Sequence, residues 1–97
     1  MVDAPHILIV DDEASVREML SILLRREGYA VEDAPGGDRA VRLLEEGNRY
    51  DLVITDLAMD RGNGLRVLEQ VKIRDPHCPV ILITAFGTTD SAVEAMK

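Results

Sequence analysis

The chain has 97 residues, of which 46% are hydrophobic and 30% charged, so we expect one globular domain and exclude a disordered tail or a fibre. Eighteen acidic and eleven basic residues give a net charge of −7, which disfavours direct binding to nucleic acid. The single cysteine, Cys78, cannot form an internal disulfide and is interpreted as a buried small hydrophobe. No run approaches the roughly 18 apolar residues of a membrane span, and no signal peptide opens the chain. These features predict a cytoplasmic domain with no membrane partner.

The first predicted elements are a strand and an amphipathic helix. Residues 7–10 are apolar without polar alternation, which is typical of a strand covered on both faces. Residues 13–27 form the predicted helix, with Asp12 as its cap, Glu13 in its first turn and Gly28 as its left-handed C-terminal residue. Its inward face is predicted from helical spacing to hold Val16, Met19, Leu20, Leu23 and Leu24.

The rest of the chain alternates in the same way. Strands are predicted at 29–34, 51–55 and 79–83, and helices at 38–46, at 65–74 and from about 88–91 to the last residue, 97. Two glycines and an asparagine in residues 60–64 predict a loop. The inward side chains of the third helix are predicted to be Leu65, Leu68 and Val71.

This alternation predicts an α/β fold, a doubly wound parallel sheet with helices on both faces. In such a sheet the functional site lies at the carboxyl ends of the strands. Asp11 and Asp12 end the first strand, Asp56 ends the third and Thr84 ends the fourth. If the first and third strands are neighbours, they lie about 4.8 Å apart, and three carboxylates share one crevice.

Three carboxylates that close together repel one another. Two unit charges about 5 Å apart repel by roughly 3 kcal/mol at an effective dielectric constant near 20, so either a proton or a cation must relieve the crowding. Oxygen ligands without histidine or cysteine favour Mg²⁺, with Mn²⁺ as the alternative, over zinc. The alternative interpretation is that each aspartate only caps a helix.

Three motifs in this order resemble a response-regulator receiver domain. They are ILIVDDE at 7–13, DLVITDLAM at 51–59 and PVILITA at 79–85, and the resemblance extends over essentially the whole chain. The segments TAFG at 84–87 and AVEAMK at 92–97 are similar to the NtrC-like branch, which activates alternative-sigma-factor promoters. The resemblance implies a flavodoxin-like sheet with strand order 2-1-3-4.

The resemblance also implies a role for each site residue. Asp56 would accept a phosphoryl group from a sensor histidine kinase, switching a transcription-activating output. Asp11, Asp12 and Asp56, with the backbone carbonyl of Ala58, would hold Mg²⁺, and Thr84 would hydrogen-bond the phosphoryl group. Such a domain assists its own phosphorylation and is not a stand-alone enzyme.

The sequence departs from the family pattern in two respects. The family has a lysine at the end of a fifth strand, and the sequence stops before that strand; Lys72 and Lys97 fall in predicted helices and cannot replace it. Residues 1–97 are therefore expected to be an incomplete receiver domain, without the fifth strand and helix. Asp60 stands where receivers commonly have proline, and it adds charge near the metal site.

Two alternatives to a phosphoacceptor remain. One is a phosphorylation-incompetent module that only interacts or dimerises, in line with the missing lysine. The other is a phosphohydrolase of the haloacid-dehalogenase type, which would need an aspartate at the position of Ala58. Whatever the function, the unpaired apolar edge of strand 79–83 predicts self-association through the side of the fourth strand and fourth helix.

Overall fold

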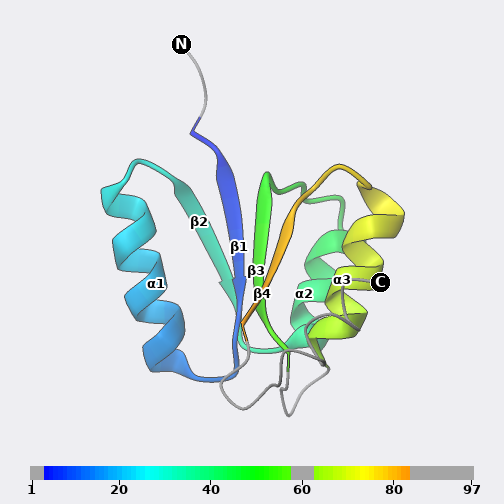
Figure 1. Ribbon diagram of the computed structural model, residues 1–97, viewed down its shortest axis with the longest axis horizontal. Helices are drawn as coiled ribbons and strands as arrows, with labels where there is room; N and C mark the ends of the chain where they lie inside the picture. The colour runs from blue at the N-terminus through cyan, green and yellow to red at the C-terminus, as the bar shows by residue number, and fades with distance from the viewer. Residues whose placement is uncertain (1–3, 58–62, 84–97) are drawn as a thin grey trace.

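Four parallel strands form the central sheet of the computed structural model, which describes residues 4–57 and 63–83. The strands are β1 (His6–Val10), β2 (Ala30–Ala34), β3 (Leu52–Asp56) and β4 (Val80–Ile83). Their order in the sheet is β2-β1-β3-β4, so β1 and β3 are neighbours (Figure 1). The predicted parallel α/β sheet is confirmed, and each predicted strand begins within one residue of the observed one.

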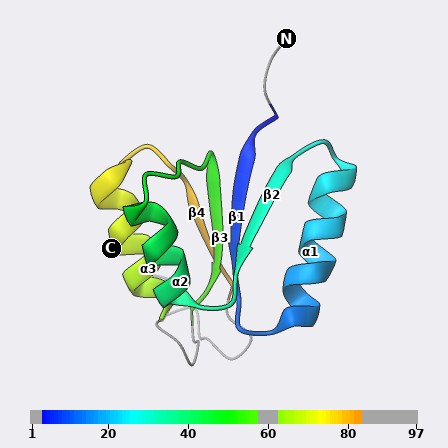
Figure 2. The ribbon, with the colours of Figure 1, turned by 180° about the vertical axis from the view of Figure 1, so that it is seen from behind.

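Three helices cover the two faces of this sheet. They are α1 (Ala14–Arg26), α2 (Gly37–Glu45) and α3 (Gly64–Arg74). Helix α1 lies on one face, while α2 and α3 lie side by side on the other (Figures 1 and 2). The helix predicted to start near residues 88–91 lies outside the described residues. Among the helices that the structure describes, none is long and apolar enough to cross a membrane.

The strand β1 is buried on both faces, as its unbroken apolar run predicts. Leu8 and Val10 pack in the larger core cluster beneath α2 and α3, together with Val53 and Val67. The other side of the strand packs in a second cluster toward α1, formed by Ile7, Ile9 and Ile54 with Leu20 and Leu24 of the helix. Full burial of each such side chain stabilises the fold by about 1.5–3 kcal/mol. The strand β1 therefore holds the residues that directly follow it in a fixed place.

Two helices end at a glycine in the left-handed region. Gly28 and Gly47 both have φ of +94°. After α1, the N–H of Gly28 donates to the carbonyl of Arg25 and that of Tyr29 to Leu24, which is a Schellman motif. Gly47 ends α2 with the same pair of bonds. The left-handed residue predicted at Gly28 is confirmed.

Some local predictions were wrong. The N-cap of α1 is Glu13, not Asp12, and its side chain makes no capping bond; the Glu13 N–H instead donates to Oδ1 of Asp11 at 2.9 Å. Met19 and Leu23 are 53% and 49% exposed, because α1 meets the sheet along a narrower face than the spacing predicts. Leu65 is also exposed, because Gly64, Val67 and Val71 occupy the buried face of α3 and Leu65 lies off that face.

Candidate functional site

The carboxyl ends of β1 and β3 bring the predicted aspartates together at one edge of the sheet, the lower edge in Figure 1. The two strands are parallel, and Val10 pairs with Thr55. The next residue of each strand is therefore an aspartate, Asp11 beside Asp56. Asp12 follows in the turn that leads to α1. Sheet register therefore accounts for the approach of Asp11 to Asp56.

One carboxylate oxygen from each of Asp11, Asp12 and Asp56 lies within 4.8 Å of the others. We refer to these three residues as the acid trio. Asp11 is buried, Asp56 is half-buried and Asp12 is exposed, so the trio runs from the interior to the surface. In residues 4–57 and 63–83 it is the one group of histidine, cysteine and acidic side chains placed closely enough to hold a metal ion. The predicted proximity of these three carboxylates is confirmed.

Three hydrogen bonds, to three different segments of the chain, hold Asp11 in place. Its Oδ1 accepts from the N–H of Glu13 at 2.9 Å. Its own N–H donates to the carbonyl of Ala34 at 3.2 Å, which ties it to the end of β2. Its carbonyl accepts from Nη1 of Arg17 at 2.7 Å. Asp11 is only 5% exposed, and the bond to its Oδ1 restricts the orientation of its carboxylate.

Arg17 is a site residue that the sequence reasoning missed. Besides its bond to Asp11, its Nε donates to Oδ2 of Asp33 at 3.1 Å, at the end of β2. The signal that could have found it is its place in the chain. It is the first lysine or arginine, and it follows four acidic residues within the first thirteen.

The backbone around Asp56 is fixed from both sides. The wholly buried Thr55 donates its hydroxyl to the Asp56 carbonyl at 3.0 Å. The N–H of Leu57 donates to Ile83 of β4, and the N–H of Gly64 donates to Leu57, each at 3.0 Å. A Cβ on Gly64 would collide with the carbonyl oxygen of Asp56. Gly64, predicted only as a loop glycine, is therefore a second missed residue, required by this close approach.

The acid trio fits a hard divalent cation. Such ions bind oxygen at about 2.0–2.6 Å, so two oxygens on one ion lie up to roughly 4–5 Å apart, and the trio already meets that spacing within 4.8 Å. The donor set holds only oxygen, as Mg²⁺ and Mn²⁺ prefer. Ala58, Asp60 and Thr84 lie outside the described residues, so their predicted roles stay predictions.

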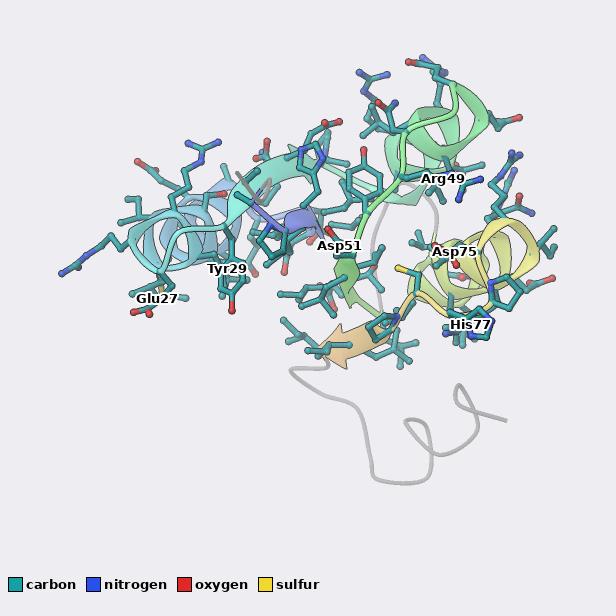
Figure 3. The ribbon with its side chains drawn as sticks, turned by 90° about the horizontal axis from the view of Figure 1, so that it is seen from above. Glu27, Tyr29, Arg49, Asp51, Asp75 and His77 are labelled. Atoms are coloured by element: carbon teal, nitrogen blue, oxygen red, sulfur yellow. The ribbon has the colours of Figure 1, made fainter. Side chains whose placement is uncertain are left out.

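The opposite edge of the sheet carries a cavity of about 310 Å³ between the ends of α2 and α3. Figure 3 views this edge and labels Arg49, Asp51 and Asp75 there. Cys78 lines the cavity at 5% exposure, and burial raises the pKa of its thiol, which favours the predicted buried, unreactive role. The cavity lacks a cluster of carboxylates, so the acid trio is the stronger candidate site.

Comparison with protein-family models matches residues 7–97 to the response regulator receiver domain. The transcriptional regulatory protein GlrR of Escherichia coli is 38% identical over 92 residues, and the response regulator protein PilR of Pseudomonas aeruginosa is 39% identical over 90. The matches cover 95% and 93% of this chain but only 20% of each relative. The chain thus spans about a fifth of the length of these relatives.

Solved structures agree with the sequence comparison. The response regulator TrrA of Thermotoga maritima, in complex with Mg²⁺–BeF, is 36% identical with a TM-score of 0.83, over 95% of this chain and 79% of that one. The beryllofluoride-activated NtrC4 receiver domain, a dimer in solution, is 33% identical with a TM-score of 0.84, over 94% of this chain and 74% of that one. The predicted flavodoxin-like fold and the resemblance to the NtrC-like branch are both confirmed.

Proposed function

The chain belongs to the response regulator receiver domain family, and from that membership we propose that it is a phosphoacceptor with Asp56 as the accepting residue. The observation that carries this proposal is the convergence of Asp11, Asp12 and Asp56 within 4.8 Å at the carboxyl edge of the sheet. The phosphoryl donor is a phosphohistidine of a sensor histidine kinase. Phosphorylation of the domain in the cytoplasm switches a transcription-activating output.

In the proposed transfer, a carboxylate oxygen of Asp56 attacks the phosphorus atom of the donor. A P–O bond forms and the P–N bond breaks, its electron pair returning to the imidazole. A carboxylate needs no base to remove a proton, so the main task of the protein is to position the reacting groups. The bonds of Thr55 and Leu57 fix the backbone on either side of Asp56 and so hold the nucleophile in place.

Charge is the second requirement, because an anionic carboxylate and an anionic phosphoryl group repel each other. Mg²⁺ held by Asp11, Asp12 and Asp56, with the Ala58 carbonyl, supplies the neutralising charge when bound. Thr84 hydrogen-bonds the phosphoryl group once it is attached. The change in charge at Asp56 then shifts the conformational equilibrium of the neighbouring β4 side of the domain.

Incubation with acetyl phosphate tests the proposal, with intact mass spectrometry as the measurement. With Mg²⁺ present, we expect the wild type to gain the mass of one phosphoryl group, and we expect excess EDTA to prevent the gain. Asp56→Asn should show no labelling, because an amide cannot form the acyl phosphate.

Asp51→Asn is the matched control, because Asp51 lies just before the same strand but at the opposite edge of the sheet (Figure 3). Its carboxylate only accepts the N–H of His6, a bond that asparagine can keep. This variant should be labelled like the wild type. Labelling of Asp56→Asn would contradict Asp56 as the accepting residue. A wild type that stays unlabelled would contradict the phosphoacceptor proposal and favour a module that only interacts.

A further inference from the structure

Arg17 connects three elements at the edge of the sheet that carries the acid trio. It lies in α1, it bonds the residue that follows β1, and it bonds a residue of β2. Its side chain is only 17% exposed, whereas that of Asp33 is 51% exposed. A mostly buried arginine with two directed bonds differs from an ordinary surface ion pair, which contributes little.

The shorter of the two bonds reaches the backbone of a trio residue. Nη1 of Arg17 donates to the Asp11 carbonyl at 2.7 Å, while Nε donates to Asp33 at 3.1 Å. A planar guanidinium donates in two fixed directions at once, which a lysine ammonium on a flexible stem does not. The peptide between Asp11 and Asp12 is therefore anchored to the end of β2 through one side chain.

We propose that Arg17 is a positioning residue for the cation site, acting through the Asp11 carbonyl to fix the turn that carries Asp11 and Asp12. This inference rests on the proposed function, since it assumes that the acid trio binds a divalent cation. Groups that orient metal ligands without touching the metal commonly change metal affinity when they are removed.

Charge and positioning predict opposite effects of removing Arg17. On charge alone, the loss of a positive group beside three carboxylates should strengthen the binding of Mg²⁺. If Arg17 positions the turn, its loss lets Asp11 and Asp12 spread, and binding weakens. The direction of the change in affinity therefore distinguishes the two roles without any measurement of phosphorylation.

The test is a Mg²⁺ titration of the chain followed by amide NMR shifts. We expect Arg17→Met, which has a similar length and no charge, to raise the dissociation constant by roughly tenfold. Arg17→Lys keeps the charge but loses the planar guanidinium, and this variant should also bind Mg²⁺ more weakly than the wild type. Arg39→Met is the matched control, since Arg39 lies on α2 and its ion pair with Glu46, at 3.5 Å, is exposed; the Mg²⁺ affinity of this variant should not change.

Folding of each variant is checked in EDTA by the dispersion of its amide signals. If Arg17→Met does not fold, Arg17→Lys decides alone, because it keeps the charge but not the planar guanidinium. Wild-type or tighter affinity in the neutral variant, or wild-type affinity in Arg17→Lys, would overturn the role of Arg17 alone. A wild type that binds no Mg²⁺ would instead overturn the metal site itself.

Discussion

Asp11 illustrates how a receiver-type site buries a carboxylate next to two others. The residue is 5% exposed, yet its carboxylate, N–H and carbonyl all have partners supplied by three different segments. In the described part of the chain, no buried side-chain nitrogen or oxygen lacks a hydrogen bond. The cost of burying polar groups is thus offset locally, and what remains is the mutual repulsion of the trio, which a cation relieves.

Tyr50 gives a prediction at the same scale, away from the site. It is 5% exposed, and its hydroxyl donates to Oε2 of Glu32 at 2.9 Å. Burial, together with this bond and the Glu32 charge, raises the pKa of Tyr50 well above its ordinary value. Tyr50→Phe should lower the free energy of unfolding by about 1 kcal/mol at neutral pH, through loss of that bond.

The pH dependence of this difference has a definite sign. Above the ordinary tyrosine pKa of about 10, only the unfolded chain ionises at Tyr50, so the wild type loses stability as pH rises. The difference in free energy of unfolding between the wild type and Tyr50→Phe should therefore decrease by at most about 1.4 kcal/mol per pH unit above pH 10. Urea unfolding of both proteins at neutral and alkaline pH measures this difference. A constant difference across that range would contradict the raised pKa.

At the scale of elements, the close approach of α3 to the end of β3 makes Gly64 sensitive to substitution. A Cβ there would meet the Asp56 carbonyl oxygen and lie 3.0 Å from the Cα of Leu57. We expect Gly64→Ala to displace the backbone of Asp56, to lower the free energy of unfolding by about 1–3 kcal/mol and to weaken Mg²⁺ binding. Urea unfolding and a Mg²⁺ titration measure the two effects.

Gly28→Ala is the control for this variant. Gly28 has φ of +94° and nothing within 4 Å of its added Cβ, so alanine costs only backbone strain, about 1–2 kcal/mol. It lies at the other end of α1 from the trio. This variant should lose comparable stability yet keep wild-type Mg²⁺ affinity. Equal Mg²⁺ affinity in both variants would show that Gly64 has no special link to Asp56.

The elements also show which features could be predicted from sequence. Apolar runs and glycines mark the strands and helix ends, so the predicted strands begin within one residue of the observed ones. The acid trio could be predicted because its members lie at the ends of two strands, β1 and β3, which are neighbours in the structure. The position of Arg17, the first lysine or arginine after four acidic residues, could have marked it as a candidate. The contacts of Arg17 and Gly64 could not be predicted, because each is made with a backbone carbonyl of another segment. The prediction that Met19 faces inward was wrong for a related reason. The spacing indicates an apolar face of the helix but not how much of that face the sheet covers.

For the whole molecule, the exposed apolar residues of β4 favour self-association. Ile81 and Ile83 are 49% and 37% exposed, and Ile81 pairs with Ile54, on the face that α1 covers only in part. Within the described residues β4 has a single strand neighbour, β3. We propose that copies of the chain associate through this surface.

Light scattering across a concentration series checks this proposal. We expect the apparent mass to rise above the 10.7 kDa of one chain at tens of micromolar, and we expect Ile81→Lys to reduce the rise. Ile73→Lys is the control, since Ile73 is 69% exposed but lies on α3, on the other face of the sheet. A single species of one chain's mass at every concentration would count against association.

The central claim is that Asp11, Asp12 and Asp56 together form one site for a hard divalent cation. Anomalous X-ray scattering from a crystal grown with Mn²⁺ tests it most directly. We predict one strong peak among the three carboxylates, at about 2.0–2.6 Å from the oxygens that bind it directly, with any remaining carboxylate reached through a water molecule. A well-ordered trio with no peak, or a peak only elsewhere on the molecule, would contradict the account.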